Sequence, residues 1–595
     1  MKFRKKAIPT SDRTDSKAEK VFDLNIDYTD AELKNPETQR NDKVRLRSYV
    51  GTGTSEDTPF VAPTIEAKPG DTVRINLNNK LPIHPSPDCK DSRDTEDENQ
   101  PNCKNYNRTN LHSHGLWISP SGNSDNVLIS IDPEKSFTYE YNIPSDHPAG
   151  TFWYHPHLHG STAIQVSSGM VGAFIIKGDR LPQETANGDI YKGDIDKLLN
   201  AAGIKERILV LQQIQYACGE DTNGNPNWNC KDSDIGKIES YKGFFSNWAT
   251  SGRYTSINGE VLPTFPDAKT GQIERWRIIH GGVRATINLE FRKEIGNTPN
   301  FNTLKAADAN AYIRKNCTGD PIPYHVIADD GLTRSKAWKT TLTTLQPGYR
   351  SDALVIFPEA GSYCVIDSSA PAGETVSGNA ESRQLLGVVE VTKGEGELKS
   401  LTTQLINAAN TIFPDQGQEN IKQIVVHDLN DGLKLSAFTP HAKITDDQVQ
   451  GAEHKQELSF KIQGGYFQIS NKINNPGYKS YQHDRIDRKL KLGSADEWTL
   501  HSAVGSHPFH IHVNPFQIVK ILNDKNEDVT DSDPEYKGLK NVWKDTLFVK
   551  SGYKITVRTH YERYIGDFVI HCHILDHEDQ GMMQNVSIVL PNHRS

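Results

Sequence analysis

Ten of the 22 histidines in this 595-residue chain lie in four short clusters, and His159 extends one of them. The clusters are His112 with His114, His155 with His157, His507 with His510 and His512, and His571 with His573 and His577. In a β-strand, residues two positions apart point to the same face, so each His-x-His pair should present two imidazole rings to one side. Paired imidazoles are typical metal ligands, so the clusters predict metal sites.

Cys572 stands between two of these histidines, so on a strand its thiol would point away from both rings. His577 follows five residues later, Met582 follows ten residues later, and His507 comes from another strand. Two histidines, one cysteine and a weakly bound methionine form the ligand set of a blue-copper electron-transfer site. A second metal centre on the opposite face would therefore be joined to the first through a single residue.

The other eight histidines are too many for one zinc ion, which takes about four ligands. They suit several metal ions that prefer nitrogen, and copper fits this preference. This eight-histidine cluster consists of His112, His114, His155, His157, His510, His512, His571 and His573. We interpret His159 as a structural residue or a support to the ligands, and the scattered histidines as ordinary surface or core residues.

Alternation of apolar and polar residues dominates the chain, whereas helical periodicity is scarce. This period of two predicts β-strands. One pattern that starts with glycine recurs three times, at 150–155, 361–366 and 566–571. We therefore predict an all-β protein of three consecutive, similar β-sandwich domains. The predicted parts are a flexible N-terminal tail at 1–19 and domains at 20–180, 200–395 and 415–595, with linkers at 181–200 and 396–415.

The three copies of the pattern differ where metal ligands would lie. The first copy continues as His-Pro-His at 155–157, and the third continues as His-Cys-His at 571–573. The second continues as Ile-Asp-Ser at 366–368, which offers no imidazole or thiol. We expect the first and third domains to bind the metal and the middle domain to hold no ligand.

The chain has seven cysteines, so at least one is unpaired. Four of them stand in two pairs that enclose short polar loops, a spacing typical of disulfide loops. The candidate pairs are Cys89 with Cys103, Cys218 with Cys230 and, by exclusion, Cys317 with Cys364. Six buried free thiols are the alternative. Disulfides would place the protein in an oxidising compartment, periplasmic or extracellular, and the N-terminal segment lacks the apolar stretch of an intact signal peptide.

Composition excludes several other classes of protein. Lys and Arg number 67 against 76 Asp and Glu, a net charge of −9, so there is no basic excess for binding nucleic acid. No run of about eighteen apolar residues occurs, so we expect no membrane span. The expected partners are small molecules, and the default oligomeric state is a monomer.

The four clusters, with Cys572 and Met582 at these spacings, resemble the multicopper oxidases, the family of laccases, bilirubin oxidases, spore-coat and cuprous oxidases and ferroxidases. The motifs span residues 112–583, and the threefold repeat is similar to three cupredoxin-like Greek-key β-sandwich domains. The resemblance implies four copper ions: one type 1, one type 2 and two type 3. It would place type 1 copper on His507, Cys572 and His577 with Met582 axial, type 2 copper on His112 and His510, and the type 3 pair on His114, His155, His157, His512, His571 and His573.

The resemblance also implies an activity. Four one-electron oxidations at the type 1 copper would match the four electrons that reduce O2 to two waters. A donor would deliver each electron near an exposed edge of His507, and Cys572 would pass it on through the histidines on either side. Glu578, directly after the last histidine of the fourth cluster, and Asp125, at a looser spacing from the first cluster, would supply protons.

The implied function is a laccase-like oxidation of phenolic or related aromatic donors. A metallo-oxidase acting on Fe(II), Mn(II) or Cu(I), and a bilirubin-oxidase-like enzyme, are the alternatives. Four methionines leave no Met-rich docking surface for Cu(I), while the acidic loop between Cys89 and Cys103 could attract harder ions. An axial Met582 would tend to lower the type 1 potential, which favours easily oxidised donors. A copper carrier without activity is disfavoured because no ligand is lost.

Overall fold

The computed structural model describes residues 18–84, 86–92, 95–185, 189–245, 248–295, 306–395, 400–413 and 419–591. The predicted N-terminal tail at 1–19 lies outside these ranges except for its last two residues, and parts of both predicted linkers also lie outside them.

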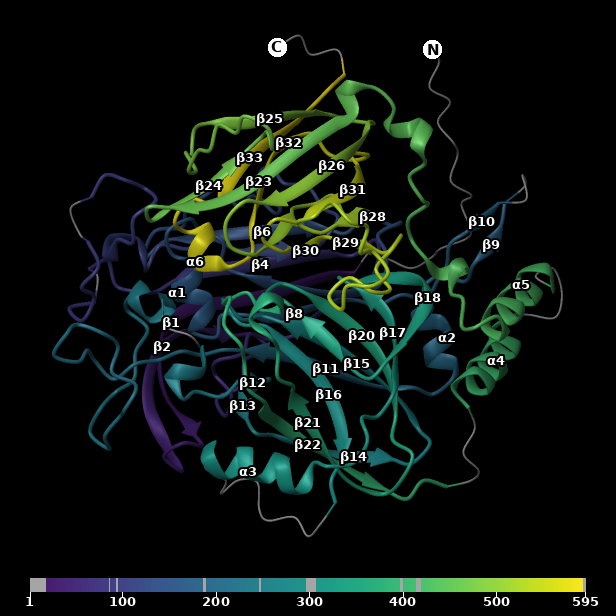
Figure 1. The fold of residues 1–595 in the computed structure, drawn as a ribbon, viewed down its shortest axis with the longest axis horizontal. Coiled ribbons are helices and arrows are strands. Elements are labelled where there is room, and N and C mark those ends of the chain that lie inside the picture. The colour runs from purple at the N-terminus through teal and green to yellow at the C-terminus, as the bar shows by residue number, and fades with distance from the viewer. Residues whose placement is uncertain are drawn as a thin grey trace.

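Apart from a two-stranded sheet of β9 (Gln183–Glu184) and β10 (Ile190–Tyr191), the strands in the described ranges form three pairs of sheets, one pair after another along the chain (Figure 1). In sheet order, the first pair consists of β2 (Arg40–Gly51), β1 (Glu19–Asn35), β4 (Thr72–Asn79) and β6 (Ser136–Asn142), and of β3 (Ile65–Ala67), β8 (Gly172–Ile176), β7 (Gly150–His155) and β5 (His112–His114). Neighbouring strands are mostly not consecutive in the chain, as Greek-key connections require.

The other two pairs are larger. The middle pair consists of β13 (Glu260–Val261), β12 (Ser256–Ile257), β11 (Lys205–Gln212), β15 (Ile273–His280), β20 (Arg350–Ile356), β17 (Tyr324–Asp329) and β18 (Leu332–Thr340), and of β14 (Thr264–Lys269), β22 (Gln384–Thr392), β21 (Gly361–Asp367), β16 (Ile287–Lys293) and β19 (Thr343–Leu345). The last pair consists of β24 (Tyr466–Ser470), β23 (Lys455–Gln463), β26 (Ala495–Ser502), β31 (Lys554–His560), β28 (Phe516–Leu522) and β29 (Trp543–Lys544), and of β25 (Ile486–Lys491), β33 (Met583–Val589), β32 (Gly566–Cys572), β27 (His507–Ile511) and β30 (Thr546–Val549).

The three pairs of sheets repeat one topology. β7, β21 and β32 hold equivalent places, each between two antiparallel neighbours. One of these two neighbours pairs in turn with a parallel strand on its other side in every copy: β8 with β3, β22 with β14 and β33 with β25. These three central strands carry the recurring glycine pattern of the sequence. The all-β fold predicted from that repeat is confirmed.

Two helices follow the middle sheets where the sequence predicts little helix. They are α4 (Leu401–Ile412), which lies in the predicted linker at 396–415, and α5 (Glu419–Asn430). The buried face of α4 recurs every three or four residues and packs with α2 (Ile195–Ala201) into one apolar cluster. Another helix, α3 (Ala306–Asn316), lies beside β22. No helix in the described ranges is long and apolar enough to cross a bilayer.

One apolar core runs through both the middle and the last pairs of sheets, from Leu209 in β11 to Ile588 in β33. A separate core fills the first pair, from Leu24 to Ile176. Because the middle and last pairs share a core, side chains of the middle sheets reach the histidine-bearing strands of the last pair.

Three disulfides join the cysteine pairs that the sequence predicts. They are Cys89–Cys103, Cys218–Cys230 and Cys317–Cys364. Among the described cysteines, Cys572 alone is free, and it is buried. Three disulfides indicate folding in an oxidising compartment.

Candidate metal centres

The eight-histidine cluster lies where strands of the first and last pairs of sheets meet. His112 on β5 is directly opposite His155 on β7, and His510 on β27 is directly opposite His571 on β32. Each of the eight side chains is at most 2% exposed. Strand register therefore sets the positions of five of these rings, and His157, His512 and His573 lie one or two residues beyond the ends of β7, β27 and β32.

Rings from the first pair of sheets stack on rings from the last pair. The ring centroids of His112 and His512 are 3.9 Å apart with planes 9° from parallel, and those of His114 and His510 are 3.8 Å apart at 14°. The cluster is thus shared between two parts of the chain more than 300 residues apart, and neither part holds it alone.

Nitrogen atoms of the cluster converge in groups of three. The groups, each with ligand atoms within 4.8 Å of one another, are His112 with His114 and His510, His114 with His155 and His573, and His157 with His512 and His571. In the last group, Nε2 of His571 is 3.1 Å from Nε2 of His157 and 3.2 Å from Nε2 of His512. Nitrogens that face each other this closely suit a shared cation.

Unpartnered nitrogens show that the cluster fits metal ions. Nδ1 of His112 contacts Asp125, Nδ1 of His155 contacts the carbonyl oxygen of its neighbour at 2.8 Å, and Nδ1 of His510 contacts the Asp545 carbonyl oxygen at 2.9 Å. Nε2 of each of these three rings is buried and has no hydrogen-bond partner. A buried polar atom without a partner costs about 1–3 kcal/mol, a cost that a metal ligand bond removes. Copper, which prefers imidazole, fits this donor set.

Burial keeps the histidines neutral. It lowers the pKa of His155 to about 3 and that of His507 to about 4. For His112 and His512, burial and then the neighbouring imidazoles lower the pKa well below the usual value. Neutral imidazole is the form that binds metal, so the folded chain presents its ligands ready for binding.

A second group of donors lies on the other face of β32. Sγ of Cys572 is 3.5 Å from Nδ1 of His507 and 3.9 Å from Nδ1 of His577, and the two nitrogens are 3.4 Å apart. His507 is oriented by the contact of Nε2 with the Val504 carbonyl oxygen at 3.0 Å. Met582 is fully buried beside this group, and its carbonyl oxygen accepts the Cys572 N–H at 3.0 Å.

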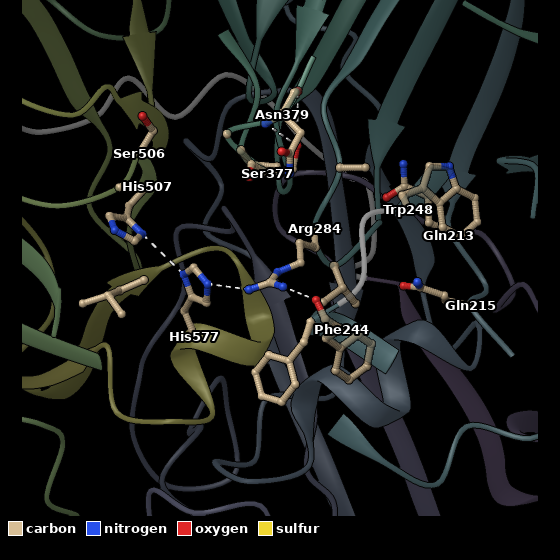
Figure 2. Close-up of a pocket in the computed structure, with 17 residues that line it drawn as sticks. Gln213, Gln215, Phe244, Trp248, Arg284, Ser377, Asn379, Ser506, His507 and His577 are labelled. Carbon is tan, nitrogen blue, oxygen red and sulfur yellow. Dashed lines mark hydrogen bonds between the residues drawn. The ribbon is translucent and has the colours of Figure 1, made fainter. Parts of the chain in front are cut away.

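This second group lies under a pocket of about 280 Å³. The predicted exposed edge of His507 is wrong, because that side chain is fully buried while His577 keeps 5% of its surface exposed. His507 nevertheless lines the pocket, together with its neighbours Gly505 and Ser506. The described lining residues include three aromatic and three amide side chains: Phe244, Phe245, Trp248, Gln213, Gln215 and Asn379 (Figure 2).

Arg284 reaches into the pocket from the loop between β15 and β16. Its Nη2 is 2.7 Å from Nε2 of His577 and 3.0 Å from Oδ2 of the buried Asp576, and its Nη1 donates to the carbonyl oxygen of Phe244 (Figure 2). Arg284 belongs to no sequence motif and lies nearly 300 residues before His577, so its role could not be predicted.

Asp125 and Glu578, the two predicted proton donors, both lie against the eight-histidine cluster. Asp125 places its oxygens 3.0 and 3.1 Å from Nδ1 of His112. Oε1 of Glu578, in α6 (Leu575–Glu578), is 3.9 Å from Nδ1 of both His157 and His159. Burial raises the pKa of Asp125 to about 7 and that of Glu578 to about 8. Both groups therefore hold protons at pH values where carboxyls are normally ionised.

Asp579, which the sequence analysis did not single out, ties the last motif to the first sheets. It accepts the N–H groups of Gly160 and Ala163, both at 2.7 Å, at the start of α1 (Thr162–Ser167), and the Tyr241 hydroxyl. Its position directly after Glu578 was the available signal. His159 packs on Tyr481, with ring centroids 4.6 Å apart, rather than stacking in the cluster.

Two family models match the motif-bearing parts of the chain. Both are described as multicopper oxidase, and they match residues 99–180 and 451–590. Among curated relatives, a laccase of Bacillus subtilis (strain 168) is 24% identical over 559 residues, 90% of this chain and 89% of its own length. The multicopper oxidase mco of Staphylococcus haemolyticus (strain JCSC1435) is 22% identical over 534 residues, 89% of this chain and 82% of its own length.

Solved structures share the fold. A multicopper oxidase from Campylobacter jejuni, described as a metallo-oxidase, has a TM-score of 0.58 at 20% identity and covers 97% of this chain and 93% of that one. The McoA multicopper oxidase from the hyperthermophile Aquifex aeolicus has a TM-score of 0.60 at 18% identity, with 96% of each chain covered. At these identities the likeness establishes the fold, and the donor must be argued from the pocket.

Proposed function

The chain belongs to the multicopper oxidase family, and from this premise we propose that it is a laccase-like enzyme that oxidises phenolic or related aromatic donors and reduces O2 to water. Bound copper supplies the one-electron redox chemistry, and the protein binds and orients the metal, the donor and the protons.

The residues that line the pocket over His577 indicate which class of donor it binds. Its aromatic and amide side chains suit a flat ring with hydroxyl groups. None of the described lining residues is Asp or Glu, whereas Fe(II) and Mn(II) prefer carboxylate ligands. The acidic loop between Cys89 and Cys103 contributes no residue to this lining. The pocket therefore favours an aromatic donor over a metal ion.

The distances support the copper assignments that the resemblance implies. His507, Cys572 and His577 would hold type 1 copper with Met582 axial, His112 and His510 type 2 copper, and His114, His155, His157, His512, His571 and His573 the type 3 pair. Cys572 is bonded through the backbone to a histidine on each side, which gives a short covalent path between the two centres.

Asp125 and Glu578 would supply protons to the oxygen-reducing centre. Glu578 would release the proton on its carboxyl beside His157, and Asp125 would hold and orient His112. Their raised pKa values, about 8 and about 7, keep the protons available near neutral pH. With three disulfides, a periplasmic or extracellular location fits, and we propose a monomer.

The test is O2 uptake by the copper-loaded protein with a phenol, bilirubin, Fe(II), Mn(II) or Cu(I) as donor at matched concentrations. Fast uptake with the phenol, lost in Cys572→Ser, is the expected result. Uptake with a metal ion alone would identify a metallo-oxidase, and preference for bilirubin would identify a bilirubin-oxidase-like enzyme. Either would overturn the phenolic assignment, and no uptake with any donor would overturn the oxidase itself.

A further inference from the structure

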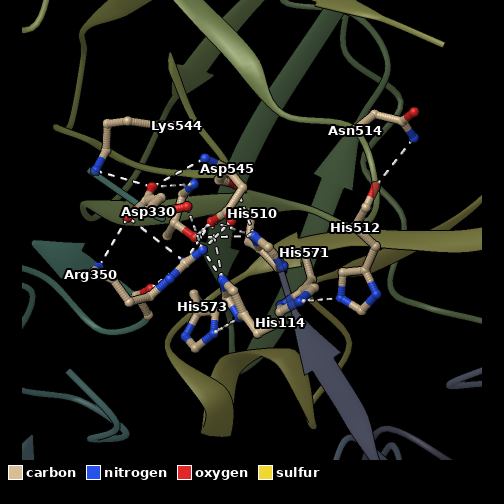
Figure 3. Close-up of polar contacts among 12 residues, drawn as sticks. His114, Asp330, Arg350, His510, His512, Asn514, Lys544, Asp545, His571 and His573 are labelled. Carbon is tan, nitrogen blue, oxygen red and sulfur yellow. Dashed lines mark hydrogen bonds and ion pairs between the residues drawn. The ribbon is translucent and has the colours of Figure 1, made fainter. Parts of the chain in front are cut away.

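Four charged side chains form a buried group directly behind the eight-histidine cluster (Figure 3). Asp330 and Arg350 come from the middle sheets, and Lys544 and Asp545 come from the last pair. None of the four is more than 3% exposed. The middle sheets contribute none of the proposed copper ligands, yet they place an acidic and a basic side chain, Asp330 and Arg350, beside the site.

The guanidinium group of Arg350 makes a bidentate contact with the carboxylate of Asp545. Nη1 donates to Oδ1 of Asp545 at 2.8 Å, and Nη2 donates to Oδ2. The same two nitrogens donate to the carbonyl oxygens of Gly348 at 2.9 Å and Asp330 at 3.0 Å. This bidentate geometry fixes the plane of the Asp545 carboxylate, which a lysine ammonium cannot do.

Asp545 in turn orients two rings of the cluster. Its Oδ1 is 3.1 Å from Nε2 of His114, and its carbonyl oxygen is 2.9 Å from Nδ1 of His510. A carboxylate only accepts hydrogen bonds, so it places the ring proton of His114 on Nε2. Nδ1 of His114, 3.3 Å from Nε2 of His573, is left as the ligand atom.

The neighbouring histidine on the same strand behaves in the opposite way. Asp125 contacts Nδ1 of His112, so Nε2 of that ring points inward and has no partner. Two histidines on β5 thus present different ring nitrogens, because a different carboxylate holds each ring. Which ring nitrogen of His114 is free to bind metal therefore depends on Asp545, and Arg350 holds Asp545 in place.

The backbone of the middle sheets also lies directly against the cluster. A Cβ atom at Gly348 would lie 2.8 Å from Cδ2 and 2.9 Å from Nε2 of His573, and the φ of Gly348 is +87°. A Cβ atom at Gly115, directly after His114, would collide with the Arg350 guanidinium and the Asp545 carboxylate. The middle sheets thus pack closely against the His573 ring, and Arg350 and Asp545 pack closely against the backbone that follows His114.

We propose that Arg350 is a positioning residue of the type 2 and type 3 copper site: it holds Asp545 so that His114 offers Nδ1 to the metal. The middle sheets, which supply no ligand, thereby determine how the trinuclear site assembles. This inference rests on the copper assignments of the proposed function.

The test compares Arg350→Gln and Arg350→Lys with the wild-type chain after copper loading. The readouts are copper per chain, the blue absorption of type 1 copper, the electron paramagnetic resonance signal of type 2 copper and the near-ultraviolet absorption of the type 3 pair. We expect Arg350→Gln to keep the blue absorption and to bind trinuclear copper about 10–100-fold more weakly, the usual effect of losing an outer partner of a metal ligand. Arg350→Lys keeps the charge and should recover part of the loss.

Arg275→Gln is the matched control. Arg275 lies on the adjacent strand β15, is equally buried, and contacts the carboxylates of Asp352 and Asp196, both at 2.5 Å, and of Glu206 at 3.2 Å. It should lower the melting temperature but leave the type 2 and type 3 signals unchanged. Normal signals in Arg350→Gln, or equal losses in both variants, would overturn the proposal.

A second variant covers the case in which Arg350→Gln does not fold. Asp545→Asn keeps the side-chain volume but replaces one of the two carboxylate oxygens with an NH2 donor, so the side chain no longer offers the two acceptor oxygens that Arg350 and His114 share. It should show the same selective loss, and normal signals there would overturn the proposal. Wild-type protein that shows no trinuclear signals would overturn the proposed function, which separates that failure from a failure of this inference.

Discussion

Nη2 of Arg284 lies 2.7 Å from Nε2 of His577, the proposed type 1 ligand, which keeps 5% of its surface exposed in the pocket. In the proposed function, a cation therefore lies where electrons would enter the protein. The buried Asp576 carboxylate, 3.0 Å from the same nitrogen, offsets part of its charge. The side chain of Arg284 is 23% exposed, so water also screens it.

Replacing Arg284 with glutamine should lower the reduction potential of the type 1 copper. A positive charge near the metal favours the reduced ion, which carries one positive charge fewer, so its loss favours the oxidised ion. We expect a decrease on the order of 60 mV, the one-electron equivalent of about 1.4 kcal/mol. Redox titration of the blue absorption measures this value, with Arg284→Lys as the control that retains the charge. An unchanged or raised potential in Arg284→Gln would contradict the role of the charge.

Gln215→Glu should shift the donor preference toward metal ions. The substitution keeps the shape of the side chain and adds a carboxylate to a pocket whose described lining has none. Fe(II) and Mn(II) prefer oxygen ligands of this kind. We expect the ratio of kcat/KM for Fe(II) to that for a phenol to rise about tenfold or more, and Gln215→Asn to leave it unchanged. A ratio that does not move would show that donors bind elsewhere.

Local patterns were sufficient to predict the histidine clusters and the repeat. The His-x-His spacing needs only a strand to bring two rings to one face, and β5, β7, β27 and β32 are such strands or end at them. The glycine pattern marks the central strand of each pair of sheets. Cys89 and Cys103 lie close in sequence, so their disulfide could be inferred from loop length alone.

The residues around the ligands could not be predicted in this way. Arg284 and Arg350 belong to the middle sheets, and packing alone brings them to His577 and Asp545. His507 is likewise fully buried although it lines the pocket, which its motif does not reveal. Helix α4 was missed because it is short and its apolar stripe spans only three turns. Contacts between distant segments leave no periodic trace in the sequence.

The copper-free protein should lose stability as the pH falls from about 6.5 to about 4. Unfolded histidines take up protons below about 6.5, whereas His155 and His507 in the folded state stay neutral down to about 3 and about 4. The unfolded state therefore binds more protons in this window, which favours unfolding as the pH falls. Buried Asp125, with its raised pKa, acts in the opposite sense, but the buried histidines outnumber such carboxyls at the site.

Urea unfolding of the copper-free chain at a series of pH values measures this dependence. Each unit of pKa difference corresponds to about 1.4 kcal/mol for each group. A free energy of unfolding that stays constant or increases toward pH 4 would contradict the prediction.

Removing the Cys317–Cys364 disulfide should affect stability without affecting copper. The bond closes a sequence separation of 47 residues inside a buried cluster of the middle sheets. The double variant with alanine at both positions should lose about 2–5 kcal/mol of unfolding free energy, measured in urea without reductant. Its blue absorption and type 2 signal should match those of the wild type. A selective loss of copper signals would show that this bond shapes the metal centres.

Glu578→Gln should slow O2 reduction without changing the type 1 copper. Glu578 is fully buried, and neither of its oxygens has a hydrogen-bond partner. Burial raises its pKa to about 8, so its proton is present below that pH and lost above it. With a donor that carries no titratable proton, such as ferrocyanide, the wild-type rate should therefore fall as the pH rises through about 8. Glutamine cannot release a proton, so the variant should be about 100-fold slower and lack this inflection.

Anaerobic reduction of the blue absorption is the control, since it needs no proton at the trinuclear site and should proceed at the wild-type rate. A variant that retains both the wild-type rate and the inflection would remove Glu578 from the proton path.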